Sequence, residues 1–251
     1  MAQKVAREIA LRVPASCRPK SAKDYEKSPI TESIEEYTEG VYRLQEELDE
    51  VGTGDIAKYM SCTSASVTTM LKRMSDLGLV EHTPYQGVRL TEKGEALSIS
   101  LLRKHRLLEC LLVDFLQLPW DDVHDLACKL EHYISEEVAD NISKALGSPV
   151  TCPHGNPIDA TTPVTGRRLS DCVPGETVRI SKITDERPEF LTYIKTIGLL
   201  PKTVVAVQSR TPFGDVLTVQ IEESSESLPI GRDVAGSIWV YGEKYPEANR
   251  N

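Results

Sequence analysis

Long apolar runs are absent from the 251-residue sequence, although 40% of its residues are hydrophobic. A helix needs about 20 consecutive apolar residues to cross a bilayer, so we expect no membrane-spanning segment. The first 14 residues also lack an apolar core, because Lys4, Arg7 and Arg12 interrupt them, and they predict no secretory signal. These absences favour a cytoplasmic protein.

Closely paired cysteines are missing as well. Six cysteines lie scattered between positions 17 and 172, and none forms a C-x-x-C pair. Disulfide frameworks are typical of short secreted chains, so this pattern favours a reducing compartment. The sequence also contains no G-x-S-x-G, H-E-x-x-H or P-loop motif, and we expect a protein that is not an enzyme.

The sequence also lacks an excess of basic residues. The chain has 38 acidic and 29 basic residues, and a net charge of −9 argues at first sight against nucleic-acid binding. Residues 52–94, however, hold five basic and four acidic residues, so this segment is close to neutral. Contact between it and DNA is allowed, and the affinity should fall steeply with salt.

Residues 30–94 have the pattern of a winged helix-turn-helix domain. The expected elements are a helix beginning at Thr31, a short helix over 53–60, a turn over 61–63, a second helix over 64–77 and a hairpin over 79–91. Gly78 ends the second helix, and the hairpin is the wing. A small helical subdomain with an incidental hairpin is the alternative, but the order and lengths of the elements favour the winged helix.

The second helix of this domain offers small hydroxyl-bearing and basic side chains for phosphate and base-edge contacts. The candidate DNA-binding residues are Thr63, Ser64, Ala65, Ser66, Thr68, Thr69, Lys72 and Arg73. No arginine or asparagine stands at the front of this helix to make a bidentate base contact. We therefore expect modest direct readout and a share of shape readout.

Residues 123–134 predict a helix with four metal-binding side chains on about one face. His124, Cys128 and His132 recur at four-residue steps, and Glu131 follows Cys128 by three. Imidazole, thiolate and carboxylate groups together suit a transition-metal ion. The alternative is a core helix whose histidines and cysteine are simply packed.

Two other helices hold further pairs of possible ligands. His105 and Glu109 are four residues apart on a long helix that begins at Glu95, and Glu36 and Glu39 lie beside the apolar stripe of the first helix. Such glutamates are either a solvated helix face or carboxylate ligands that point inward. The helices over 95–152 have more apolar surface than one small domain can cover, so a homodimer interface is expected there.

The remaining segments complete a mainly α chain with a small β domain. We expect a mobile arm over 1–29, a helical metal-binding and dimerisation domain over 95–152, a linker over 153–168 and an SH3-like barrel of short strands over 169–243. Cys152 and His154 lie among prolines of the linker, where two such residues are more often structural than metal ligands.

This arrangement resembles the diphtheria toxin repressor family of metal-dependent transcriptional regulators, which has iron-responsive and manganese-responsive branches. The resemblance extends from about Pro29 to Tyr241 and is most specific over 103–109 and 123–132, where residue types and spacing match together. In the β domain, Ile197-Gly198-Leu199 also matches.

The resemblance implies two metal sites. The primary, regulatory site would use Glu36, Glu39, His105, Cys128, Glu131 and His132. The ancillary site would use His105, Glu109, His124 and a carboxylate of the β domain, for which Glu189 is the candidate. Glu36 stands where iron-type members have methionine, and in this respect the chain is similar to manganese-type members. Cys128, in contrast, stands where some manganese-type members have a carboxylate. Added carboxylates favour Mn²⁺ and thiolates favour softer ions, so Mn²⁺ is the favoured cofactor and Fe²⁺ the alternative.

The expected function is a metal-dependent repressor of manganese or iron homeostasis. Metal would join the first helix to the dimerisation helices and so fix the spacing of two recognition helices on a palindromic operator in double-stranded DNA. A metal-dependent hydrolase is one alternative, although it would need an open coordination position and a substrate cleft. A winged-helix regulator that responds to a non-metal ligand, with a merely structural His/Cys/Glu cluster, is the other.

The identity of residue 36 is predicted to tune the choice of metal. Replacing Glu36 by methionine removes a hard carboxylate and supplies a soft thioether, so the variant is expected to shift its preference away from Mn²⁺. Competition between Mn²⁺ and Fe²⁺ for the purified protein measures this shift. An unchanged ranking of the two metals would contradict the role assigned to Glu36.

Overall fold

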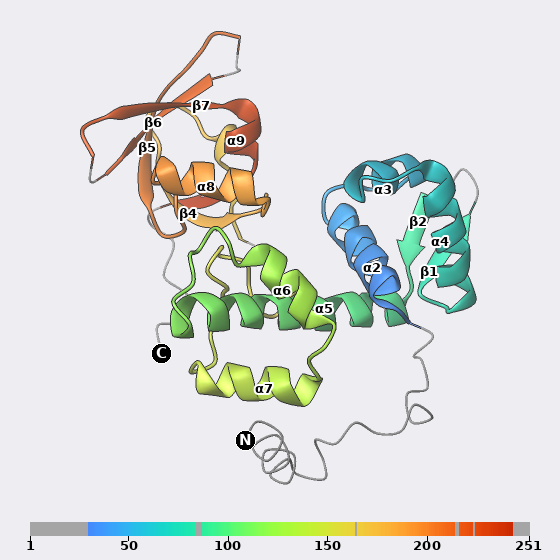
Figure 1. The fold of residues 1–251 in the computed structure, drawn as a ribbon. Helices are drawn as coiled ribbons and strands as arrows, with labels where there is room; N and C mark the ends of the chain where they lie inside the picture. The colour runs from blue at the N-terminus through green and yellow to red at the C-terminus, as the bar shows by residue number, and fades with distance from the viewer. Residues whose placement is uncertain (1–29, 84–86, 164, 214–215, 223, 243–251) are drawn as a thin grey trace, which may run out of the picture. The chain divides into compact units, whose positions relative to one another are not determined.

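The structure is a computed structural model that describes residues 30–83, 87–163, 165–213, 216–222 and 224–242 (Figure 1). Contacts within the chain separate residues 1–31 from a compact unit that begins at Glu32. The arm predicted over 1–29 lies outside the described residues. No helix in the described ranges is long and apolar enough to span a membrane.

The first part of the unit is the predicted winged helix-turn-helix. Its elements are α2 (Glu32–Gln45), α3 (Thr53–Tyr59), α4 (Ser64–Asp76), β1 (Val80–Thr83) and β2 (Gly87–Leu90). The side chain of Thr63 accepts a hydrogen bond from the backbone N–H of Ser66 and so caps α4. Gly78, with φ of +69°, follows α4 and allows the turn into the antiparallel hairpin.

Packing inside this domain uses one apolar face of each helix. Ile34 and Val41 of α2, Ile56 of α3, and Val67 and Leu71 of α4 are all fully buried. Burial at three- and four-residue spacing is what the sequence periodicity predicts for amphipathic helices. Because α2 belongs to this core, a shift of α2 would also move the helix-turn-helix packed against it.

The second part is a set of helices around one long helix. They are α5 (Glu92–Cys110), continued by the π-helical turn Leu111–Phe115, then α6 (His124–Glu131) and α7 (Glu136–Ala145). Figure 1 shows α6 and α7 beside α5, and small clusters of buried apolar side chains hold both to it. Helix α5 also contacts α2, so the winged-helix domain and the helical domain share an interface.

The third part is a six-stranded antiparallel sheet with the strand order β3-β8-β4-β5-β6-β7. Its elements are β3 (Arg167–Arg168), a 3-10 turn (Leu169–Asp171), β4 (Thr177–Ile183), α8 (Pro188–Thr196), β5 (Val204–Arg210), β6 (Val216–Ile221), β7 (Ser227–Gly231), α9 (Arg232–Gly236) and β8 (Ile238–Gly242). Alternate strand residues such as Val178, Ile180, Val205 and Val219 fill its core. The predicted fold class, mainly α with a small SH3-like β domain, is confirmed.

A close backbone approach at Gly94 joins the hairpin to α5. The N–H of Gly94 is hydrogen-bonded to the Thr91 hydroxyl, and a Cβ at position 94 would collide with the carbonyl oxygen of Leu79 and press on Leu90. This position therefore requires glycine for space, although its φ lies outside the left-handed region.

Gly94→Ala is expected to lower the free energy of unfolding by about 1–3 kcal/mol, because the backbone must shift to admit the methyl group. Gly54→Ala in α3 is the matched control, since a Cβ there meets no atom within 4 Å. The control should be neutral or stabilising by up to about 1 kcal/mol. Urea denaturation of both variants provides the comparison, and equal stabilities would contradict the packing argument.

Candidate metal centre

Helix α6 places His124 and Cys128 on the face that α5 covers. The Sγ atom of Cys128 lies 3.6 Å from His124 Nε2 and 3.8 Å from His105 Nδ1. Burial disfavours the Cys128 thiolate, but hydrogen bonds from the two imidazoles hold the pKa of this thiol below its usual value. Cys128 is therefore prepared to act as a thiolate ligand.

Helix α5 contributes the centre of the cluster. His105 is 1% exposed, and it lies 2.7 Å from Glu131 Oε2 through Nδ1 and 2.9 Å from Glu109 Oε1 through Nε2. Both ring nitrogens face carboxylates, and both donate hydrogen bonds when the imidazole is protonated. Burial alone would lower the pKa of His105, but the charge of Glu109 and these hydrogen bonds raise it well above its usual value.

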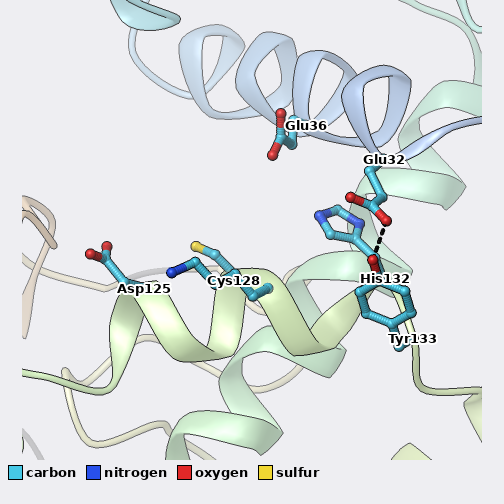
Figure 2. A pocket seen from close by; sticks show the side chains of 7 residues that line it. Glu32, Glu36, Asp125, Cys128, His132 and Tyr133 are labelled. Atoms are coloured by element: carbon cyan, nitrogen blue, oxygen red, sulfur yellow. Dashed lines mark hydrogen bonds between the residues drawn. The ribbon is translucent and has the colours of Figure 1, made fainter.

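Helix α2 reaches the cluster through its first two turns. The Nδ1 atom of His132 lies 2.6 Å from Glu35 Oε2, and this hydrogen bond leaves Nε2 of His132 available to a metal. Glu36 is exposed and lines a pocket of about 260 Å³ together with Cys128, His132 and residues of both helices. Figure 2 shows Glu36 on α2 on one side of this pocket, and Cys128 on α6 and His132 directly after α6 on the other.

Glu39 is placed differently from Glu36, although both are on α2. Its Oε1 accepts a hydrogen bond from Arg43 Nε at 2.8 Å, and Arg43 also donates from Nη1 to Glu186 Oε2 at 3.1 Å. Glu39 is thus already paired with a cation. Its charge still reaches the cluster, since it contributes to raising the pKa of Glu131, for which burial is the larger cause.

A second group of ligands surrounds Glu109, which is fully buried. Glu109 Oε1 lies 3.0 Å from His154 Nδ1 and 3.6 Å from His124 Nδ1, and the ligand atoms of Glu109, Cys152 and His154 lie within 4.8 Å of one another. His154 Nε2 faces the carbonyl oxygen of Trp120 at 3.1 Å and so must be protonated. Burial opposes a charge on His154, but Glu109 raises its pKa.

The β domain brings Glu186 next to this group, whereas the predicted residue Glu189 is not among the side chains that meet there. Glu186 is 7% exposed and lies 3.6 Å from His124 Nδ1, whereas Glu189 is exposed on α8. Glu186 precedes α8 and is held by a hydrogen bond from Asn156 Nδ2 at 2.7 Å. Pro188 begins α8 after Glu186, so the helix turns Glu189 to solvent.

The segment 152–158 packs more closely than its prolines suggest. Cys152, His154 and Asn156 are buried there, and the N–H of Ile183 donates to the carbonyl of His154 at 2.9 Å. The signal was present as a Cys-Pro-His tripeptide. The importance of this tripeptide becomes apparent only in the tertiary structure, where the chain returns to Glu109 of α5. The contact between Glu35 and His132 had no sequence signal of its own.

The cluster fits divalent cations by a structural criterion. Glu109 Oε2 and His124 Nδ1 are buried and have no hydrogen-bond partner among the described residues. Buried polar atoms without partners are costly, and here both atoms belong to metal-binding side chains. The protonated histidines and Arg43 occupy positions where positive charge is needed beside Glu109, Glu131 and Glu186.

All eight candidate DNA-binding residues are exposed in the structure. The hydroxyls of Thr68 and Thr69 donate to the carbonyls of Ser64 and Ala65 within α4, and their lone pairs remain available. The surface of α4 therefore offers the small polar side chains that were predicted, and their contact with DNA stays a prediction.

Three parts of the chain match known protein families. Residues 29–88 match the N-terminal DNA binding domain of iron dependent repressors, residues 91–160 their metal binding and dimerisation domain, and residues 167–241 the FeoA domain. The iron-dependent repressor IdeR of Mycobacterium tuberculosis is 33% identical over 216 residues, which cover 80% of this chain and 94% of that protein.

Solved structures show the same similarity. A manganese-dependent transcriptional repressor in complex with manganese has 30% identity and a TM-score of 0.77, with 83% of this chain and 99% of that chain covered. T. acidophilum IdeR has 28% identity and a TM-score of 0.71, with coverage of 85% and 99%.

The buried histidine cations predict how the stability of the metal-free protein depends on pH. Burial lowers the pKa of His124, but the nearby Cys128 thiol and the Glu109 and Glu186 carboxylates raise it to about 10, and the pKa values of His105 and His154 are also raised. A raised folded-state pKa stabilises the fold fully below about pH 6.5, the ordinary value for histidine, and this stabilisation is lost as the pH rises through the folded value. Each such group contributes a slope of at most about 1.4 kcal/mol per pH unit.

The free energy of unfolding in excess chelator is therefore expected to fall between about pH 6.5 and pH 10. Urea titrations at several pH values measure it. His124→Gln cannot hold the proton and should show a shallower fall. A flat profile for the unaltered protein would contradict the protonation states assigned to the cluster.

Proposed function

Because the chain belongs to the family of iron-dependent repressors and is a metal-dependent, DNA-binding transcriptional regulator, we propose that metal binding between α2 and α6 controls its affinity for DNA. The observation that supports this most directly is the contact of Glu35 with His132 at 2.6 Å. It joins the first helix of the DNA-binding domain to the helix that holds Cys128, Glu131 and His132. A divalent ion bound there would add strong, directional bonds between the same two helices.

We propose that the regulatory site uses Glu36, Glu39, His105, Cys128, Glu131 and His132. Cys128, Glu131 and His132 lie in or next to α6, and Glu36 faces them across the pocket of Figure 2. Glu35 acts as a positioning residue, because its hydrogen bond fixes the ring of His132. His105 has its Nδ1 beside both Glu131 and Cys128 and can join them only after giving up a proton.

The second site is proposed around Glu109, with His105 and His124 as expected and with Glu186 in place of Glu189. Cys152 and His154 extend this ligand set, because their donor atoms converge on Glu109. Ligands from α5, from the segment 152–158 and from the β domain would thus meet in one place. Their role is to hold the β domain and the helical domain together.

The proposed metal is Mn²⁺, with Fe²⁺ as the alternative. Glu36, Glu39 and Glu131 favour a hard ion, and Cys128 favours a softer one. The metal would act on a homodimer, since residues 91–160 match a dimerisation domain and apolar side chains such as Phe115, Leu116 and Tyr133 are exposed nearby. Linking α2 to α6 in both protomers would fix the separation of the two α4 helices on a palindromic operator. The proposed location of the protein is the cytoplasm.

In a DNA-binding titration, we expect the affinity for operator DNA to rise when metal is added and to fall when metal is removed. Adding Mn²⁺ or Fe²⁺ to the purified chain should tighten operator binding, and chelation should reverse the effect. By linkage, operator DNA should tighten metal binding by the same factor. Fluorescence anisotropy with a labelled operator and isothermal titration with metal measure the two sides of the cycle.

A control separates the regulatory contact from general loss of charge. Glu35→Gln keeps the size of the side chain and removes the carboxylate beside His132, whereas Glu137→Gln changes a glutamate on α7 that the site does not use. Glu35→Gln should need about tenfold more metal for the same DNA binding, as expected for an outer-shell partner. DNA binding that ignores metal in the unaltered protein would overturn the proposed function.

A further inference from the structure

Arg43 lies between the two proposed metal sites and contacts one carboxylate of each. It is in the last turn of α2, and its Nε is 2.8 Å from Glu39 Oε1 while its Nη1 is 3.1 Å from Glu186 Oε2. The side chain of Arg43 is 21% exposed, and those of Glu39 and Glu186 are 14% and 5% exposed. Pairs this sheltered from water are weakly screened by salt.

A guanidinium and a divalent ion compete for the same carboxylate oxygens. Arginine stays charged at every accessible pH, and its planar fork holds two acceptors in defined directions. Glu39 can therefore join the regulatory site only if its bond to Arg43 is exchanged for one to the metal. Removing a hydrogen bond between charged groups costs about 1.5–3 kcal/mol, which corresponds to roughly ten- to hundredfold in affinity.

Glu36 has no such competitor among the side chains that the structure describes. It is exposed, and no ion pair or hydrogen bond of its carboxylate occurs within those residues. The two carboxylates of α2 are thus unequal, although the sequence presents them as a pair. One faces an open pocket, and the other is already neutralised.

We propose that Arg43 is a metal-selectivity residue that competes with the ion for Glu39. The proposal rests on the proposed function and refines its regulatory site. While Arg43 holds Glu39, the site offers Glu36, Cys128, Glu131 and His132, which is a softer set than six ligands that include both α2 carboxylates. Arg43 therefore lowers the affinity for Mn²⁺ more than that for Fe²⁺, because Mn²⁺ gains more from an added carboxylate.

A double-mutant cycle on the purified full-length chain tests this competition. Arg43→Gln should raise Mn²⁺ affinity about tenfold and raise the Mn²⁺/Fe²⁺ affinity ratio. Glu39→Gln alone should change Mn²⁺ affinity by less than about threefold, because Glu39 is not fully available in the unaltered protein. Combining the two should remove the gain. Isothermal titration with Mn²⁺, and with Fe²⁺ under anaerobic conditions, measures all four proteins.

Matched variants identify the source of any gain. Arg103 also contacts two carboxylates, Glu136 and Asp140, but away from the cluster, so Arg103→Gln should leave both metal affinities unchanged. The gain in Mn²⁺ affinity from Arg43→Gln should persist at the regulatory site when Glu186→Gln is added. If Arg43→Gln is too unstable to purify, Arg43→Lys replaces it, because a single ammonium cannot hold both carboxylates in the same geometry. A smaller gain is then expected.

Three results would overturn the proposal. The first is a loss of about tenfold or more in Mn²⁺ affinity from Glu39→Gln alone. The second is an unchanged Mn²⁺ affinity in the purifiable Arg43 variant. The third is a gain in Mn²⁺ affinity that persists without Glu39 but disappears without Glu186. Failure of the proposed function looks different. The metal affinities would follow the cycle, but operator binding would not respond to metal. An unaltered chain that binds neither ion would overturn both.

Discussion

Several carboxylates are buried close together between α2, α5, α6 and the segment before α8, and the centre of this protein depends on how their charge is balanced. Glu109, Glu131 and Glu186 are each less than 10% exposed. A buried carboxylate without a counter-charge is strongly destabilising, so cations must come from the chain or from solution. Within the chain, three histidines and Arg43 can supply them.

In the proposed mechanism, the same balance is also the means of regulation. Each proton that leaves a histidine makes room for a metal bond, so metal binding, proton release and the approach of helices are one equilibrium. Helix α2 is the element on which these effects converge, because its apolar face belongs to the DNA-binding core and its polar face to the cluster. A change of a few kcal/mol in the contacts between α2 and α6 is enough to shift a two-state equilibrium by orders of magnitude.

Local patterns predicted the helices and most of the side chains that the structure brings together in the cluster, because periodicity and spacing are properties of neighbouring residues. The winged helix, the helix holding His124 and Cys128, and the small β domain all follow from such patterns. Glu186 could not be distinguished from Glu189, since the choice depends on whether α8 begins before or after the carboxylate. Cys152 and His154 were undervalued because only the tertiary fold returns them to Glu109, 43 and 45 residues earlier in the chain.

If Arg43 competes for Glu39 as proposed, metal preference is a property of the contacts among several side chains rather than of the ligands alone. Glu36 and Glu39 are chemically identical and three residues apart, yet one faces a pocket and the other is paired with Arg43 at 2.8 Å. The hardness of the site depends on which of the two is free when the ion arrives. Arg43 in turn is held in place by Glu186, so the carboxylate content of the regulatory site is linked to the β domain through one guanidinium. If Arg43 competes for Glu39 as proposed, a substitution of Arg43 changes the ligand set of the regulatory metal without touching that metal.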